Sequence, residues 1–433
     1  MTQPQTYLEA LKHCSDAMIS AQKPILILDA IKWPQQTEVE FFADGAKRLP
    51  AISREDYARM NPLGFDPDDK RRELESIAHT ITQRLGADDP LGRILLQTLN
   101  QYQTVVSMLE NRGTPAFQAA SQTLYGSTRD ALRGDTLSLI DLGKRLCEIF
   151  SLPAAQHLNA SHPKNIEAGA AVDILRQRLQ PYFVDSAFTV KETDGIVSDA
   201  SAGGDCIKVN THAAFSKLDL QVLEVHEGWV HVGTTLNGRN QPWATWLSAG
   251  SPRITALQEG LAVLIETLTF SSFPGRARRI SDRVVAIDMA EAGADFMEVY
   301  RHFINQGLGQ RESYKIAQRV FRGGDVAGGA CFTKDLSYVR GLVETVNFIR
   351  SAILADRPEL LPWLFAGKVA LDDIPTLYHY HKEQIIAPPR YLPPMFRDLN
   401  GLYVWFGFSS GFAAIDLKNI QAHFQSLFRQ HPS

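Results

Sequence analysis

The sequence predicts an α+β fold that is mostly helical. Three observations support this: apolar residues recur at helical spacing before about residue 150, two short runs near residue 200 are rich in β-branched residues, and helical patterns resume after them. Many helices with a few short strands are typical of the α+β class. The 433 residues are enough for two closely packed parts. We expect a mainly helical part over residues 1–150 and a second part over residues 151–433.

In the first part, helical periodicity is clearest over Leu74–Leu85, Leu91–Asn111 and Thr136–Phe150. The apolar run Pro24–Ala30 is compatible with either a strand or a buried turn. The first part therefore needs no sheet of its own.

The second part opens with the predicted strands, Ala187–Glu192 and Cys206–Asn210. The stretch between them is prone to turns and contains Gly203 and Gly204, so a hairpin or small sheet is expected. A helix follows over Leu218–Leu236.

Capping residues bound that helix. Ser216 or Asp219 is a suitable N-cap, and Asn237-Gly238 is a suitable stop. Later helices are expected at Thr255–Phe270, Ile280–Gln306, Glu312–Phe321 and Lys334–Leu354. His379–Pro394 is rich in proline, which predicts an extended segment wrapped over the surface.

Composition limits the function classes. The net charge is −4 and no long Lys/Arg run occurs, which argues against a nucleic-acid partner, because phosphate neutralisation needs a clustered basic surface. No stretch reaches about 18 uncharged apolar residues and the N-terminus lacks a signal pattern, so no membrane partner is expected. The four cysteines show no CxxC spacing. These features favour a cytoplasmic protein.

Two histidines, His226 and His231, lie five residues apart in VLEVHEGWVH. A regular α-helix turns about 100° per residue, so their side chains would diverge by about 140° and could not share one metal ion. A π-type irregularity, bonding i to i+5, would return both imidazoles to one side, and Gly228 lowers the steric barrier to it. We therefore predict π-type backbone between Glu227 and His231.

A catalytic zinc ion takes three protein ligands and leaves a fourth position for water. Glu259 in LQEGLA is the third candidate, because it is a carboxylate in an otherwise apolar helix and coordination would remove the cost of its burial. Glu227 would be the general base. The order of strand pair, histidine helix and glutamate helix is similar to glutamate-zincin peptidases. A surface His–Glu pair and a partly exposed Glu259 are the alternatives.

HEGWVH followed by LQEGLA resembles the bacterial QEGLA-motif proteins, some labelled flavohaemoglobin expression-modulating, whose animal members are the microtubule-associated tyrosine carboxypeptidases. The likeness extends over roughly residues 150–394. It implies a zinc carboxypeptidase in which His226, His231 and Glu259 hold Zn²⁺ and Glu227 is catalytic. The animal members carry long N-terminal regions associated with microtubule binding. This mildly acidic chain begins almost directly with helices, so acidic tubulin tails are not the expected partner.

Two further segments are similar to family blocks, RVFRG at 319–323 and FTKDLSYVRG at 332–341. Lys334 and Tyr338 are four apart on an expected helix and therefore share a face. A carboxypeptidase needs a cation for the substrate's terminal carboxylate and a donor for the oxyanion. Arg322 or Lys334 suits the first role and Tyr338 the second. A solvated Lys334–Asp335 pair and a core position for Tyr338 are the alternatives.

The sequence thus predicts a zinc-dependent carboxypeptidase that removes a C-terminal residue such as Tyr, Phe or Glu from a protein or peptide. The rival hypothesis is a regulatory or binding protein with a structural zinc site. Such a site needs a fourth protein ligand, for which Glu224 and Glu266 are close in sequence. An aminopeptidase or endopeptidase on the same core is a third possibility.

Overall fold

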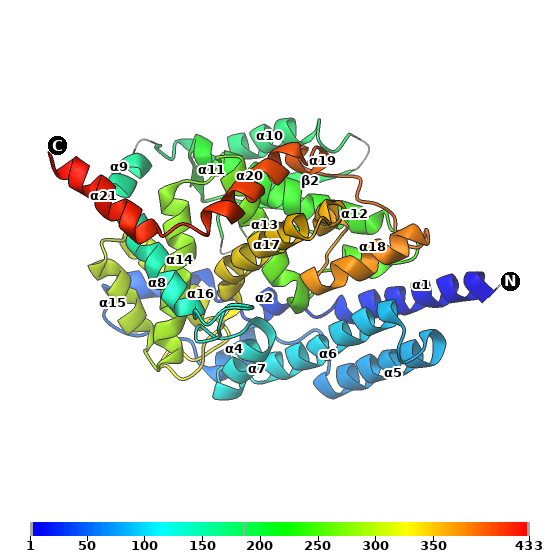
Figure 1. Ribbon diagram of the computed structural model, residues 1–433. Coiled ribbons are helices and arrows are strands. Elements are labelled where there is room, and N and C mark those ends of the chain that lie inside the picture. The colour runs from blue at the N-terminus through cyan, green and yellow to red at the C-terminus, as the bar shows by residue number, and fades with distance from the viewer. Residues whose placement is uncertain (1–2, 161, 185–186, 195, 197, 431–433) are drawn as a thin grey trace.

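The computed structural model describes residues 3–160, 162–184, 187–194, 196 and 198–430 (Figure 1). Helices dominate and two small sheets accompany them, so the mostly helical α+β class is confirmed. The described residues up to 160 form the following helices: α1 (Gln3–Gln22), α2 (Ile27–Ala30), α3 (Gln35–Ala43), α4 (Arg54–Met60), α5 (Pro67–Leu85), α6 (Pro90–Glu110), α7 (Pro115–Tyr125), α8 (Leu139–Phe150) and α9 (Pro153–Ala160).

Local sequence explains where these helices begin. Proline is the first residue of α5, α6 and α7, where its missing N–H costs no hydrogen bond. The Asp66 side chain accepts from two backbone N–H groups of α5, and the Asp89 side chain accepts from one in α6. The run Pro24–Ala30 contains the one-turn helix α2 and no strand. A single helical turn is too short to show a periodicity that the sequence could reveal.

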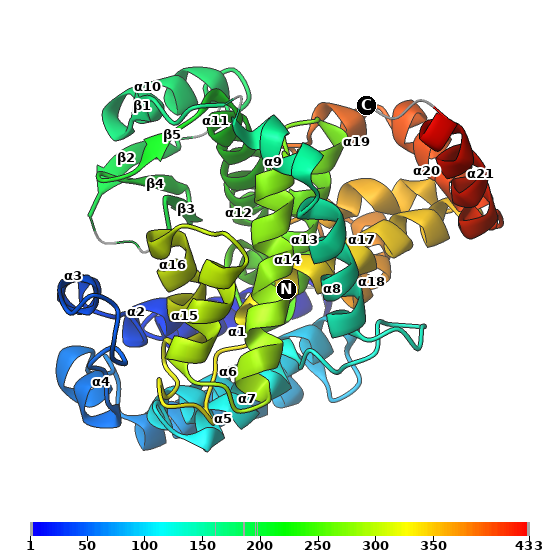
Figure 2. The same cartoon turned by 90° about the vertical axis from the view of Figure 1, so that its left-hand side faces the viewer.

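A three-stranded sheet lies at one end of the molecule, with α10 (Ala168–Leu179) beside it (Figure 2). Its strands are β2 (Thr189–Thr193), β3 (Ala200–Gly203) and β4 (Cys206–Asn210), in the order β2-β4-β3. The predicted small sheet is confirmed, but its two predicted strands are not a hairpin, because β2 and β4 run parallel. The hairpin partner of β4 is β3, and Gly204 makes the turn between them with a φ of 64°. β1 (Ile166–Glu167) and β5 (Ala214–Phe215) form a second, two-stranded sheet.

The helix expected over Leu218–Leu236 is continuous but changes type along its length. It consists of α11 (Lys217–Leu223), a π-helix (Glu224–Val232) and α12 (Gly233–Arg239). Ser216 and Asp219 form a capping box at its start, as predicted. Gly238 does not stop the helix. A Cβ there would lie 2.0 Å from the Leu247 carbonyl oxygen, so this glycine permits a close backbone approach.

The range Ile280–Gln306, expected as one helix, is divided into two. Gly293 adopts a φ of 100° after α14, and Asp295 begins α15 with a capping box. The following elements complete this region: α13 (Thr255–Leu268), α14 (Pro274–Glu291), α15 (Phe296–Asn305), α16 (Gln310–Phe321), a 3-10 turn (Lys334–Leu336), α17 (Ser337–Leu354) and short 3-10 helices at Thr245–Ser248, Pro252–Ile254, Pro358–Phe365 and Leu371–Asp373.

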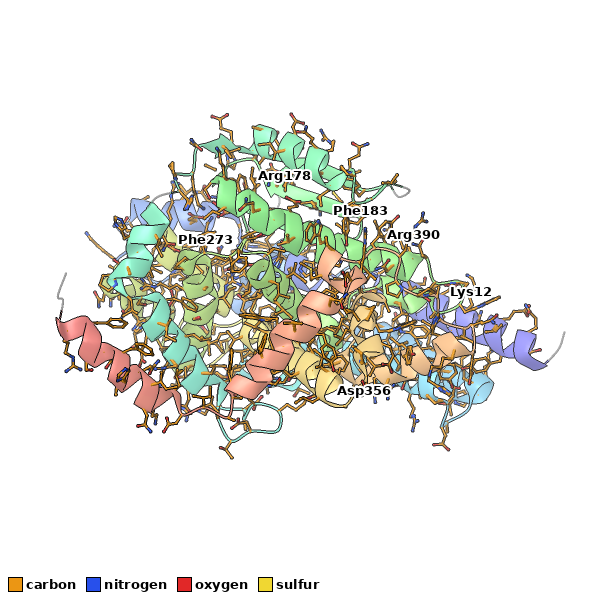
Figure 3. All side chains as sticks on the ribbon, turned by 45° about the horizontal axis from the view of Figure 1, so that its top comes forward. Lys12, Arg178, Phe183, Phe273, Asp356 and Arg390 are labelled. Atoms are coloured by element: carbon orange, nitrogen blue, oxygen red, sulfur yellow. The ribbon has the colours of Figure 1, made fainter. Side chains whose placement is uncertain are left out.

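The proline-rich segment is extended over only part of the predicted range. His379 to Lys382 belong to α18 (Ile374–Lys382), and irregular backbone follows from 383 to 393, where three of the four prolines lie. The chain then forms α19 (Pro394–Arg397), α20 (Asn400–Phe412) and α21 (Leu417–Gln430). Figure 3 shows α20 crossing the near face and α21 continuing past it toward the C-terminus. None of the described helices has the length and apolar composition that a membrane crossing requires.

Two glycines bring α13 and α17 unusually close. A Cβ on Gly260 would lie 1.9 Å from the carbonyl carbon of Gly341, and a Cβ on Gly341 would lie 1.7 Å from the Ala256 oxygen. The largest apolar core contains residues of both helices together with residues of α1, α6 and α7. One apolar core therefore holds helices from both predicted parts of the chain together. The division of the chain near residue 150 stays a prediction.

Candidate metal centre

The two histidines lie on a π-helix, Glu224–Val232, which confirms the predicted type of backbone. Its wider turn brings the rings of His226 and His231 to 4.9 Å between centroids, with their planes at 82°. The irregularity covers nine residues, more than the stretch expected. Gly228 is not among the glycines with positive φ. Its missing side chain makes room for Leu179, whose Cδ2 would lie 2.4 Å from an added Cβ.

Glu259 of α13 completes a cluster of three metal-ligating side chains among the described residues. Its Oε2 lies 3.5 Å from His226 Nε2 and 3.7 Å from His231 Nε2. Tetrahedral zinc with bonds of about 2.0–2.1 Å places its ligand atoms about 3.3 Å apart, so only a small movement would close the site. Within the described part of the chain, this buried Oε2 has no hydrogen-bond partner. An unpartnered carboxylate oxygen facing two imidazoles fits a cation.

The surrounding charges also favour a cation between these groups. Burial lowers the pKa of His226, but Glu259, Glu266 and Glu227 outweigh it and raise that pKa to about 10. Burial likewise raises the pKa of Glu259, yet Lys334 and the two histidines hold it well below its usual range. Positive charge is therefore stabilised at the meeting point of the three side chains, and a metal ion would supply it.

His226 is oriented by an ionised carboxylate on its far side. Glu266 is fully buried and its Oε1 lies 2.6 Å from His226 Nδ1. Arg276 donates to both Glu266 oxygens, at 2.9 and 3.2 Å. Burial would raise the pKa of Glu266, but Arg276 and His226 hold it at about 2. With a metal ion bound, this carboxylate would keep the proton on Nδ1 and leave Nε2, which faces Glu259, free to coordinate.

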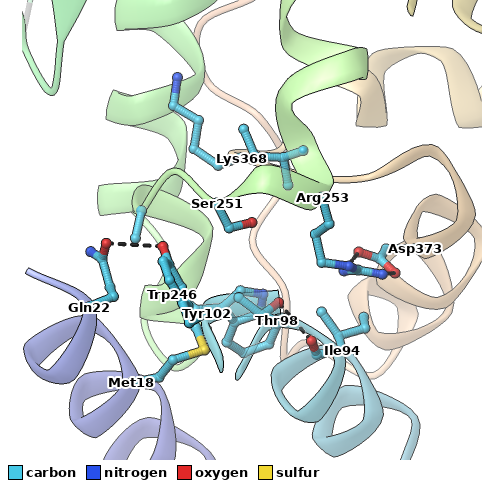
Figure 4. A pocket seen from close by; sticks show the side chains of 12 residues that line it. Met18, Gln22, Ile94, Thr98, Tyr102, Trp246, Ser251, Arg253, Lys368 and Asp373 are labelled. Atoms are coloured by element: carbon cyan, nitrogen blue, oxygen red, sulfur yellow. Dashed lines mark hydrogen bonds and ion pairs between the residues drawn. The ribbon is translucent and has the colours of Figure 1, made fainter. Parts of the chain in front are cut away.

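His231 is oriented by an amide instead. Its Nδ1 lies 3.3 Å from Gln258 Oε1, which also accepts from Lys368 Nζ at 2.8 Å and Thr234 Oγ1 at 3.0 Å. Lys368 donates further to the His231 carbonyl at 2.9 Å. Figure 4 shows the Lys368 amino group directed away from a narrow cavity that this residue lines. Burial lowers the pKa of Lys368 to about 7.

Glu227 is held by the sheet. Its carboxylate is buried and its Oε2 accepts a hydrogen bond from Ala202 N of strand β3 at 2.6 Å. Glu227 directly follows His226 on the π-helix. The edge strand therefore fixes the orientation of a carboxylate beside the first histidine.

The structure also brings Lys334 and Tyr338 to the cluster. Lys334 Nζ lies 3.2 Å from Glu259 Oε1, and the Tyr338 ring stacks against His226 with centroids 6.4 Å apart. The close contact between α13 and α17 explains why these side chains meet. Glu259 is next to Gly260 on α13, and Tyr338 lies three residues before Gly341 on α17. Lys334 is not a solvated partner of Asp335, since both side chains are nearly buried.

Arg322 belongs to a buried group of arginines that the sequence did not reveal as a group. Arg319 donates to both oxygens of Asp335, at 2.5 and 2.9 Å, and Arg283 approaches the same carboxylate at 3.6 Å. The Arg283 guanidinium lies 4.6 Å above the Tyr338 ring centroid. Burial and Arg319 lower the pKa of Arg322 to about 10. Two guanidiniums thus contact one carboxylate, and Arg322 lies close to both Arg319 and Asp335.

Two N–H donors of this arginine group are not satisfied by the described protein atoms. Arg283 Nη1 and Arg322 Nε are buried and have no hydrogen-bond partner among the residues that the structure describes. Such groups are costly unless a ligand satisfies them. A partial signal was present in the sequence, because Arg319 and Arg322 share the RVFRG segment at a spacing of three.

A family profile described as microtubule-associated tyrosine carboxypeptidase matches residues 39–414. The chain belongs to this family. The residues of the candidate metal centre, from Ala202 to Lys368, lie inside the matched range, whereas α21 lies beyond it. Among curated proteins, none matches the chain significantly.

One solved structure that matches is that of a lipoprotein from Colwellia psychrerythraea. It is 12% identical, with a TM-score of 0.36, and the match covers 76% of this chain. The chain spans 66% of the length of that protein. A likeness of this size carries no argument about fold or function.

Proposed function

We propose that this family member is a zinc-dependent carboxypeptidase that hydrolyses the C-terminal peptide bond of a protein or peptide. The observation that carries the proposal is the juxtaposition of a three-residue metal cluster with a buried excess of arginines. The family's description as carboxypeptidases supports the same reaction class. The order of sheet, histidine helix and glutamate helix supports a glutamate-zincin-like core.

His226, His231 and Glu259 would hold the zinc ion. When bound, zinc lowers the pKa of a coordinated water to about 7 and polarises the scissile carbonyl. Glu266 and Gln258 keep the two histidines in the tautomer that presents Nε2 to the metal. The three ligands leave the fourth position for water.

Glu227 acts as the general base. The hydrogen bond from Ala202 N restrains Oε2, and Oε1 is not used in that bond, so it can accept a proton from the attacking water. The protonated Glu227 then donates that proton to the departing amine. Its place next to His226 keeps this transfer beside the reacting carbonyl.

The arginine group recognises the substrate's terminal carboxylate. Among the described residues, Arg283 and Arg319 share the Asp335 carboxylate and Arg322 Nε has no hydrogen-bond partner, so an incoming anion would compensate the remaining positive charge. The Tyr338 ring stacks against His226 and lies under the Arg283 guanidinium, which supports a role for its hydroxyl as the donor to the oxyanion. Because a group of buried guanidiniums repels an amino terminus, this arrangement favours a carboxypeptidase over an aminopeptidase.

Lys334, which pairs with the second oxygen of Glu259, also supports recognition of an anionic substrate. It is nearly buried and its ammonium group adds positive charge between the ligand cluster and the arginine group. A terminal Tyr, Phe or Glu on a protein or peptide would fit this chemistry. The net charge of −4 does not favour acidic tubulin tails.

The regulatory alternative requires a closed site with four protein ligands. Of the two candidates for the fourth, Glu266 is bonded to the far nitrogen of His226 and to Arg276. Glu224 pairs with Arg178 at 3.2 Å. Both carboxylates are engaged away from the metal side, which supports an open catalytic site.

Matched peptides with free and amidated C-termini test the proposal. We expect the zinc-loaded protein to release one residue from free peptides and to leave amidated peptides intact, with products identified by mass spectrometry. Cleavage of amidated peptides at the same rate would contradict the carboxypeptidase assignment. Cleavage of neither kind, across terminal Tyr, Phe and Glu, would favour the regulatory alternative.

A further inference from the structure

Helices α20 and α21 carry an apolar surface that the described part of the chain leaves uncovered. These helices, α20 and α21 with the turn between them, are here called the C-terminal arm (residues 400–430). α20 packs on the body through buried Leu402 and Phe406, and Arg350 donates to Ser409 Oγ at 2.8 Å. Its other sides carry large apolar side chains that are 45–62% exposed: Tyr403, Val404, Trp405, Phe408 and Phe412.

α21 continues this apolar surface away from the body. Every described side chain on it is exposed, and Leu417, Ile420, Phe424 and Phe428 recur every three or four residues along one side. It lies at the edge of the molecule in both Figures 1 and 2. An isolated helix of 14 residues is only marginally stable in water, so an amphipathic helix of this kind needs a surface to pack on.

We propose that the C-terminal arm is the interface of a homodimer, in which the same surface of a second copy of this chain covers it. Ten large apolar side chains of the arm are exposed. At about 100 Å² each they offer on the order of 1,000 Å² per chain, against about 800 Å² per partner in a standard stable interface. Gly407 and Gly411, one turn apart on α20, face open space where a partner helix could approach closely.

The low charge of the arm favours a second copy of this chain as its partner over a lipid surface or a nucleic acid. Residues 400–430 contain one Asp, one Lys and one Arg. In a two-fold interface a surface meets itself, so an uncharged patch avoids the like-charge repulsion that a charged patch would suffer. An anionic lipid surface or a nucleic acid would require clustered Lys and Arg, which the arm lacks. The polar side of α21 carries amides instead, including Asn419, Gln421 and Gln425.

Sedimentation velocity on the full chain tests the proposal. The wild type should sediment as a species of twice the chain mass of 48.2 kDa. Trp405→Glu on α20 and Phe424→Glu on α21 should each raise the dimer dissociation constant at least about 30-fold, the effect of losing a central aromatic anchor. Leu26→Glu is the matched control, because Leu26 is 56% exposed but lies outside the arm. Far-ultraviolet circular dichroism should show a folded body in all three variants, with at most the helical signal of α21 lost in the two arm variants.

Three results would overturn the dimer. The first is a wild-type chain that stays monomeric even at about 100 μM. The second is a dimer that both arm variants retain. The third is a monomeric wild type that floats with vesicles of phosphatidylcholine and phosphatidylglycerol while the arm variants do not, which would assign the arm to a lipid surface. None of these measurements depends on metal or peptidase activity, so failure here is separate from failure of the proposed function.

Discussion

His226 and His231 point at the same position but are held in different ways. His226 is 5% exposed and is fixed by an ionised Glu266, which Arg276 clamps. His231 is 15% exposed and is fixed by the neutral amide of Gln258, which Lys368 holds in place. An imidazole that donates its Nδ1 proton to a carboxylate is more basic at Nε2, and so binds a metal ion more strongly, than an imidazole that donates to an amide. The comparison indicates that, in the proposed metal site, His226 would be the more rigidly held ligand and His231 the more adjustable one.

The first prediction concerns a substitution that changes neither histidine nor the hydrogen-bond partners of the histidines. Glu227→Gln keeps the size of the side chain and removes the general base. We expect kcat to fall by about 10²–10⁴-fold while zinc affinity stays unchanged. Peptide turnover and zinc titration on the same preparation would check this. Retained turnover would remove Glu227 as the base.

Breaking the support of His226 should have the larger effect on metal binding. Glu266→Gln leaves Arg276 buried without its carboxylate, so the free energy of unfolding should fall by about 3–5 kcal/mol. Zinc affinity, measured by competition with a chromophoric chelator, should fall by about 10–100-fold.

Glu224→Gln is the control for Glu266→Gln. Glu224 pairs with Arg178 near the surface, and loss of such a pair should cost at most about 1 kcal/mol. Equal effects of the two substitutions on zinc affinity would refute the anchoring role of Glu266.

Breaking the support of His231 should have a smaller effect. Lys368→Met removes one of the two donors to Gln258 Oε1 and leaves only Thr234, so the amide can rotate more easily away from His231. Zinc affinity should fall by about tenfold, the low end for residues that orient a ligand. Lys315→Met, at a half-exposed lysine paired with Asp199, should leave affinity unchanged. A loss of affinity as large as that of Glu266→Gln would show that the two supports are equivalent.

The smallest effect is expected from a substitution that gives His231 the same kind of hydrogen-bond partner as His226. Gln258→Glu would give His231 a carboxylate partner, with Lys368 in place as its counter-charge. Zinc affinity should rise by a few-fold, which the same chelator competition would detect. A fall in affinity would mean that the amide at Gln258 is required for its neutrality.

The ligand set could be predicted from the sequence because its signals are local. The five-residue spacing of His226 and His231 is incompatible with a regular helix that binds metal, so it predicts the π-helix. Glu259 stands out as a carboxylate among apolar neighbours. The break at Gly293 was missed, although a glycine followed by the capping pair Asp295 and Glu298 is a typical helix boundary.

The supports of these ligands could not be predicted, because they depend on tertiary contacts. Lys368 lies 137 residues after the His231 carbonyl that it contacts. The arginine group assembles from α14 and α16, and nothing in either helix alone indicates that they meet around Asp335. The parallel pairing of β2 with β4 is likewise invisible to local patterns, which favoured a hairpin.

Metal content tests the central claim most directly, namely that His226, His231 and Glu259 share one ion. The wild type and His231→Ala would be prepared without affinity-tag histidines, supplied with zinc, and measured by mass spectrometry. We predict about one zinc per wild-type chain and its loss in the variant. A wild type without metal, or a variant that retains a full equivalent, would contradict the account.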